Sequence, residues 1–163
     1  MTDFFDSASQ QFPAGAEYVA LYGDGDFKAP PSVARRFPHV RYITVLGDYA
    51  TCGCADYEAG NEVFSQPGML RAWVQGRRRM NCLARVYVDR ANAAEALDLV
   101  GGYPNLRWWI STLDNNPHWT AEELAADLRD NWHADIPPAD LWGVQYSGGM
   151  TAEFDTSLLL GSW

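Results

Sequence analysis

The feature that most constrains this chain is an alternation of short β-rich segments with segments of helical periodicity. β-branched, aromatic and other apolar residues concentrate in about seven short segments. These expected strands cover residues 18–22, 40–46, 53–58, 83–88, 106–111, 141–146 and 152–157. The spacing of apolar residues predicts helices over residues 31–37, 65–80, 92–100 and 120–132. Strands and helices in this order indicate an α/β sheet or an irregular barrel.

The last two expected strands depart from the alternation. Only residues 147–151 separate them, and this connection is too short for the helix that a parallel crossover needs. Gly148 and Gly149 permit a sharp turn there. We therefore expect an antiparallel hairpin at the end of the chain. The sequence shows no obvious eighth strand.

Length and composition favour one globular domain. A chain of 163 residues buries a sizeable core but is short for two domains. Residues 1–16 are small and polar apart from one Phe-Phe pair, which predicts a flexible N-terminal arm and a single domain over residues 17–163. The net charge of −9 repels phosphate backbones, so nucleic acid is not an expected partner.

The cysteines and the hydropathy disfavour further classes. Cys52, Cys54 and Cys82 cannot all pair within the chain and match no zinc or thioredoxin spacing, so we expect reduced thiols, no metal site and no cofactor. No stretch reaches the roughly 20 apolar residues that a membrane span requires. The start of the chain also lacks the pattern of a signal peptide, so we expect a protein that is cytoplasmic when made.

An acidic pair ends the third expected strand. Successive side chains of a strand alternate between its two faces, so Asp56 and Glu58 project from one face, roughly 6.5–7 Å apart along the strand. Two carboxylates this close favour keeping a proton on one of them near neutral pH, which is the state that general acid catalysis needs. The alternative is a solvated turn between a strand and a loop, and the spacing alone leaves both interpretations open.

Several short motifs occur in an order that resembles a known family. They are Asp56-Tyr57-Glu58, Trp73 ahead of Arg77-Arg78, Val86-Tyr87-Val88, Trp108-Trp109-Ile110-Ser111, Trp142-Gly143-Val144-Gln145-Tyr146 and the late Asp155. In this order the chain resembles the family 25 glycoside hydrolases, and more closely the shortened glycoside-hydrolase-like domains of actinobacteria and their phages. The resemblance covers residues 18–160. It implies an irregular, shortened TIM-like (β/α) barrel that closes with an antiparallel hairpin.

The resemblance also implies roles for individual residues. Glu58 would protonate the leaving glycosidic oxygen as general acid, and Asp56 would assist the 2-acetamido group of the sugar. Asp155 and Asp24 would be further acids at the barrel mouth, with Asp26 competing for the place of Asp24. The candidate substrate-binding residues are Tyr57, Trp109, Trp142, Gln145 and Tyr146. For each of the aromatic side chains, packing in the core is the alternative.

Two functions follow from the resemblance. The first is an enzyme that hydrolyses peptidoglycan or another N-acetylated cell-wall glycan, as a muramidase does. The second is a non-catalytic domain of the same fold that binds wall glycan or forms part of a phage particle, with residues 1–16 contacting phage structural proteins. In both cases the expected partner is cell-wall glycan, reached by release from the cell or by carriage on a phage particle.

Overall fold

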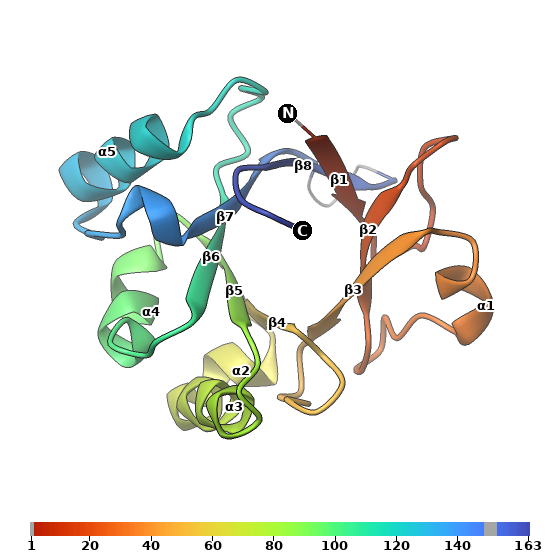
Figure 1. Cartoon of the computed structure of the whole chain (residues 1–163), viewed down its shortest axis with the longest axis horizontal. Helices are drawn as coiled ribbons and strands as arrows, with labels where there is room; N and C mark the ends of the chain where they lie inside the picture. The colour runs from red at the N-terminus through yellow and green to blue at the C-terminus, as the bar shows by residue number, and fades with distance from the viewer. Residues whose placement is uncertain (1, 149–152) are drawn as a thin grey trace.

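Eight strands close into a barrel in the computed structural model, which describes residues 2–148 and 153–163. The strand order around the barrel follows the sequence (Figure 1). The strands are β1 (Thr2–Asp6), β2 (Tyr18–Tyr22), β3 (His39–Thr44), β4 (Cys54–Tyr57), β5 (Ala84–Asp89), β6 (Leu106–Ser111), β7 (Leu141–Ser147) and β8 (Asp155–Leu159). A closed barrel leaves no strand edge unpaired, which removes the main route to edge-to-edge aggregation.

The strand directions determine which residues meet at each end of the barrel. Strands β1 to β7 run parallel to one another, whereas β8 is antiparallel to both β7 and β1. The expected antiparallel pairing of the last two strands is thus confirmed, while Gly149 of the expected turn lies outside the described residues. The C-terminal ends of β1 to β7 and the N-terminal end of β8 therefore meet at one end of the barrel.

The helices pack on the outside of the barrel, as Figure 1 shows. They are α1 (Pro31–Ala34), α2 (Glu62–Ser65), α3 (Pro67–Arg79), α4 (Ala93–Val100), α5 (Ala121–Trp132) and the 3₁₀ turn η1 (Pro138–Asp140). Outward side chains of β4 to β8 form the largest apolar cluster with α2 to α5, and those of β2 and β3 pack near α1. No helix within the described residues is long and apolar enough to cross a membrane.

Strand β1 corrects the expectation of a flexible N-terminal arm. Residues 2–6 pair with β2 on one side and β8 on the other, so they close the barrel. Phe4 is fully buried, and its ring centroid lies 4.9 Å from those of Trp109 and Trp142. The domain therefore includes residues before 17, and residues 2–6 are not free to bind phage proteins as an arm. This strand is also the eighth one that the sequence did not reveal.

Inward-pointing side chains fill the middle of the barrel with an apolar layer. Its members are Phe4, Ala20, Ile43, Cys54, Tyr87, Trp109 and Trp142. A register shift between β6 and β7 leaves Trp142 as an extra residue, since Trp108 lies opposite Leu141 and Trp109 opposite Gly143. Such a bulge re-aims a side chain, and here it places a large indole within the barrel. Polar and charged side chains occupy the two ends of the barrel on either side of this layer.

Candidate active site

Four carboxyl groups gather where β1 to β7 end. Asp6 is the last residue of β1, Asp56 lies near the end of β4, Glu58 follows β4, and Asp155 begins β8. Strand pairing places Asp6 directly opposite Asp155. Cys54 belongs to the interior layer, so the two-residue period of a strand directs Asp56 and Glu58 inward as well. These acids come from three strands that the sequence separates widely, and the parallel barrel brings them together.

A cavity of about 510 Å³ opens at this end of the barrel. Its walls are Ser7, Ala8, Ser9, Phe27, Glu58, Tyr87, Leu113, Gln145, Glu153, Phe154 and Asp155. Glu58 and Asp155 thus share one cavity. Asp56 is only 2% exposed and does not line the cavity. The volume is within the range of small-molecule sites, about 300–1,000 Å³.

Glu58 is the acid best placed for proton transfer to a ligand. Burial raises the pKa of its carboxyl group above the ordinary value, and the charges of Asp89 and Asp155 raise this pKa further. The nearby Tyr87 hydroxyl acts in the opposite direction and lowers the pKa. The net shift is upward, so the protonated form persists to a higher pH than in a solvated glutamate. A carboxylic acid on a cavity wall with this shift is suited to general acid chemistry.

Asp56 is more deeply buried than Glu58. Burial is the main cause that raises its pKa well above the ordinary value, and the charge of Glu58 adds to it. The Tyr22 hydroxyl donates a hydrogen bond to Asp56 Oδ2 at 3.3 Å, and contacts with Tyr22 and Asn61 partly lower this pKa. Asp56 Oδ1 is buried without a hydrogen-bond partner among the described residues. Buried oxygens are seldom left unsatisfied, which marks this position as one that stability alone does not explain.

Asp6 belongs to the same acid cluster, and the sequence analysis missed it. Burial raises its pKa well above the ordinary value, followed by the charges of Asp155, Asp56 and Glu58. Its Oδ1 atom is also buried without a partner within the described part of the chain. The alternation of Phe4 and Asp6 on one face was the available signal. It was weak because Phe5, on the other face, is apolar too.

Tyr87 and Gln145 form the polar wall beside Glu58. The Tyr87 hydroxyl donates a hydrogen bond to Gln145 Oε1, and both side chains line the cavity. Tyr87 thus supplies a hydrogen-bond donor to the amide oxygen of the buried Gln145. The backbone carbonyl of Gln145 accepts hydrogen bonds from the amides of Thr112 and Leu113, at 2.9 and 3.2 Å. Strand β7 thereby fixes the loop that follows β6.

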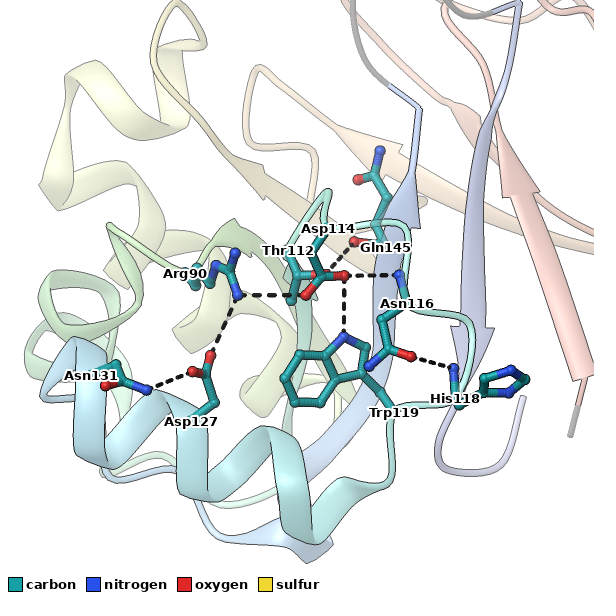
Figure 2. Close-up of polar contacts among 9 residues, drawn as sticks. All are labelled: Arg90, Thr112, Asp114, Asn116, His118, Trp119, Asp127, Asn131 and Gln145. Carbon is teal, nitrogen blue, oxygen red and sulfur yellow. Dashed lines mark hydrogen bonds and ion pairs between the residues drawn. The ribbon is translucent and has the colours of Figure 1, made fainter.

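The loop after β6 is held by a polar network around Asp114 (Figure 2). Asp114 Oδ1 accepts hydrogen bonds from Thr112 Oγ1 at 3.1 Å, the Asn116 amide at 3.1 Å and Trp119 Nε1 at 3.3 Å. Arg90 lies between two acids, 3.6 Å from Asp114 Oδ2 and 3.5 Å from Asp127 Oδ2. These contacts set the rim of the cavity, including Leu113.

The structure corrects the role expected for Asp24. Its Oδ2 atom accepts a hydrogen bond from Thr44 Oγ1, and its Oδ1 atom accepts from the amides of Val45 and Leu46 at 2.8 and 3.3 Å. Asp24 does not line the cavity, and its carboxylate is occupied in fixing the turn after β3. Asp26 also lies outside this cavity and lines a separate one. Neither residue joins the acid cluster.

The expected aromatic contacts are corrected as well. Tyr57 faces away from the cavity, because the alternation that directs Asp56 and Glu58 inward directs the residue between them outward. Its hydroxyl donates to Glu95 Oε1 of α4 at 2.9 Å. Tyr146, next to Gln145, packs against the outer cluster for the same reason.

The two tryptophans point into the barrel but are buried below the cavity. Trp109 Nε1 donates to Ser157 Oγ at 3.0 Å, and Trp142 Nε1 donates to the carbonyl of Ser162 at 2.8 Å. Neither indole lines the cavity. Phe27, Leu113 and Phe154 take the place of the expected aromatic walls. Of these, Phe27 and Leu113 are 48% and 47% exposed and stand at its rim.

No protein-family model, curated protein or solved structure matches the chain.

The chemistry that this cavity permits follows from the side chains on its walls and from the groups that the structure does not bring together. Within residues 2–148 and 153–163, no group of three or more histidine, cysteine or acidic side chains has an arrangement that would hold a metal ion. The three cysteines are free thiols, of which Cys52 and Cys54 are buried. What the cavity offers is Glu58, whose pKa is raised, together with Asp155 and an apolar rim.

Proposed function

We propose that the protein is a glycoside hydrolase-like enzyme that acts on peptidoglycan or another N-acetylated cell-wall glycan. In this proposal the barrel is a shortened form of the TIM-like (β/α) barrel, with its site at the C-terminal ends of the parallel strands. One observation carries the proposal: Glu58, with a raised pKa, lines a cavity of about 510 Å³ together with Asp155 and directly follows the buried Asp56 strand. Sites at that end are typical of such barrels because the loops there vary freely.

Glu58 acts as the general acid. It protonates the glycosidic oxygen as the bond to the leaving sugar breaks, so it must hold its proton before the reaction. Burial and the charges of Asp89 and Asp155 raise its pKa and favour that state. Positioned proton transfer of this kind contributes about 10²–10⁴ in rate.

Asp56 assists the 2-acetamido group of the bound sugar. Its Oδ1 atom, which has no hydrogen-bond partner among the described residues, accepts from the amide N–H of that group once a local rearrangement on sugar binding exposes it. When the acetamido oxygen attacks the anomeric carbon, the sugar itself supplies the nucleophile. The enzyme then needs no second carboxylate at the short carboxyl-to-carboxyl distance that is typical of double-displacement enzymes. A pair of acids on one strand is therefore compatible with this reaction.

The rim of the cavity supports a carbohydrate ligand. Phe27 and Leu113 expose apolar surface beside acids and the amide of Gln145. A sugar ring presents an apolar face and polar hydroxyl edges, so it matches a rim of this mixed character. Leu113 is held at a φ of 50°, which is unusual for a leucine and indicates a position imposed by its surroundings.

The second candidate is a non-catalytic domain of the same fold that binds wall glycan or serves as a component of a phage particle. The short connections favour it, because α1 and α2 have four residues each and build little wall around a long glycan. Retention of acids with raised pKa favours the enzyme. The two candidates differ in turnover and share glycan binding.

Digestion of purified cell walls tests the proposal. Wild type is expected to release reducing ends, and Glu58→Gln should lower the rate by about 10²–10⁴ while keeping glycan binding, since glutamine preserves shape but cannot deliver a proton. Asp56→Asn should also impair release. Glu17→Gln, an exposed acid at the start of β2, is the matched control and should behave as wild type.

The outcomes separate the two candidates. Equal release by wild type and Glu58→Gln would contradict the role of Glu58. If neither wild type nor Glu58→Gln releases reducing ends but both co-sediment with walls, the protein is the non-catalytic glycan-binding domain. The absence of both release and co-sedimentation would reject the glycan as ligand.

A further inference from the structure

Two arginines lie on the inward side of the barrel at the end opposite the acids. Arg85 is the second residue of β5 and Arg41 the third of β3, so both lie near the N-terminal ends of their strands. Arg85 is only 6% exposed, and Arg41 is half-buried. The Nε atoms of both side chains are buried and have no hydrogen-bond partner in the described part of the chain. Burying a guanidinium without acceptors is costly, so their placement requires an explanation.

Each of the two guanidinium groups lies over the indole ring of a different tryptophan. The Arg85 guanidinium carbon is 4.7 Å from the ring centroid of Trp142, and that of Arg41 is 5.3 Å from the ring centroid of Trp163. The two indole centroids are 5.4 Å apart. Cation–π contact stabilises a positive charge over a ring face but offers no acceptor for the N–H groups. The aromatic contacts therefore orient both arginines and leave their Nε–H groups without an acceptor among the described residues.

No acid neutralises this pair. Among the described residues, the ion pairs involve Arg90, Arg107 and Arg129 but neither Arg41 nor Arg85. Burial lowers the pKa of Arg85 to about 10, and the charges of Arg41, Arg77 and Arg107 act in the same direction. In a chain of net charge −9, Arg41 and Arg85 are thus both without an ion pair among the described residues.

A third arginine extends the cluster. Arg77 Nη2 donates to the Leu83 carbonyl at 2.9 Å, and Nη1 donates to the Tyr49 carbonyl at 3.1 Å. A Cβ placed on Gly53 would lie 3.8 Å from Arg77 Nη2 and 3.9 Å from Arg85 Nη1, so two guanidinium groups converge on one small residue. The neutral carbonyls fix Arg77 without removing its charge.

We propose that Arg41 and Arg85 form a binding site for a small oxyanion, a phosphate, sulfate or carboxylate group, at the N-terminal end of the barrel. Guanidinium groups match such anions because their planar forks donate paired hydrogen bonds. The half-buried Arg41 gives solvent access, and Arg85 and the two tryptophans provide a fixed, dry wall. The bound anion supplies the acceptors that the protein lacks here and relieves the repulsion between the two cations. This site is independent of the acid cavity and of the proposed glycan chemistry.

Unfolding in urea at pH 7, followed by tryptophan fluorescence, measures this binding. Sodium chloride is replaced at constant ionic strength by sodium phosphate, sodium sulfate or sodium acetate. Phosphate and sulfate also stabilise proteins in general by exclusion from the surface, and that effect acts equally on all variants. The informative quantity is therefore the difference between wild type and Arg85→Met. Arg129→Met, which removes an exposed arginine from α5, is the matched control.

A bound oxyanion raises the urea midpoint of unfolding of wild type and of Arg129→Met as the anion concentration increases. The reason is that a ligand that binds only the folded state stabilises that state. Arg85→Met and Arg41→Met should show only the general salt effect, and calorimetric titration should find the anion bound at least tenfold more weakly by Arg85→Met. A response to acetate alone assigns a carboxylate ligand, and a response to phosphate and sulfate assigns a tetrahedral one. In chloride, Arg85→Met should be at least as stable as wild type, because methionine removes an unpaired buried charge.

Equal shifts in wild type, Arg85→Met and Arg129→Met would overturn the proposal. So would a loss of stability of Arg85→Met in chloride without any oxyanion response of wild type, which would give the arginines a packing role only. If Arg85→Met does not fold, Arg41→Met, a substitution of the half-buried arginine, is compared with wild type instead. An anion-dependent rise of its urea midpoint equal to that of wild type would contradict the site.

Discussion

Replacement of Asp6 by asparagine is expected to stabilise the protein at neutral pH and to flatten the pH dependence of its stability. Asp6 is buried opposite Asp155, and burial and the neighbouring acids raise its pKa well above the ordinary value. The folded state thus retains a proton on Asp6 at a pH where the unfolded chain, with a pKa of about 3.9, has lost it. A group with a raised folded pKa contributes stability that is fully present below the unfolded pKa and is lost as pH rises through the folded pKa.

The magnitude follows from this linkage. Between the unfolded and folded pKa of Asp6, the free energy of unfolding falls by about 1.4 kcal/mol per pH unit for this one group. An asparagine cannot ionise and carries no such loss, so Asp6→Asn should be about 1–3 kcal/mol more stable than wild type at pH 7. At pH 4 little of this loss has occurred, and the difference should shrink toward zero.

Urea unfolding from pH 4 to pH 8, followed by tryptophan fluorescence, provides the measurement. Asp26→Asn removes the same charge from an exposed position and should change the free energy of unfolding by less than about 0.5 kcal/mol. If wild type and Asp6→Asn show the same dependence on pH from 4.5 to 7, Asp6 ionises normally in the folded state, and the raised pKa is refuted.

Two further substitutions test local features of the fold by urea unfolding. Thr120 caps α5 by accepting a hydrogen bond from the Glu123 amide at 3.2 Å, so Thr120→Ala should lose about 0.5–2 kcal/mol, whereas Thr120→Ser should keep the cap. A destabilised Thr120→Ser would contradict a role for the hydroxyl. Gly148 has a φ of 138°, and a Cβ there would overlap the Asp155 carboxylate, so Gly148→Ala should destabilise the fold and disturb Asp155. Gly102→Ala, with nothing near its added Cβ, is the control, and equal effects of the two glycine substitutions would contradict the steric argument.

The interior pattern of each parallel strand could be predicted from the sequence more readily than the closure of the barrel. The period of two residues correctly placed Asp56 and Glu58 on one face, and the same period already excluded Tyr57 from that face. Strand β1 was missed because Thr2, Phe4 and Phe5, although they favour strands, are interrupted by two aspartates and followed by a small, polar stretch. Its pairing with β8 joins residues more than a hundred positions apart, and no local pattern encodes such contacts.

The content of the site was predictable only in part for the same reason. Glu58 and Gln145 reach the cavity from positions that local alternation identifies, whereas Asp6 depends on β1 and on its antiparallel neighbour. Trp142 points inward because of a register shift between β6 and β7, which is a property of the pairing and not of either strand. Asp24 was misassigned because a strand-end acid looks the same in sequence whether it faces a ligand or fixes a turn.

The acidic side chains at one end of the barrel and the arginines at the other form no ion pairs with each other among the described residues. Arg85 lies opposite Cys54 in the pairing of β4 and β5, and Asp56 is two residues further along, about 7 Å by the rise of a strand. An ion pair across this distance would satisfy both groups, yet neither forms one within the described residues. The aromatic layer intervenes, with ring centroids of Tyr87 and Trp109 4.7 Å apart and those of Trp109 and Trp142 5.8 Å apart. Both ends therefore retain unsatisfied polar groups that the outer apolar cluster must offset, and a ligand at either end would relieve that cost independently of the other.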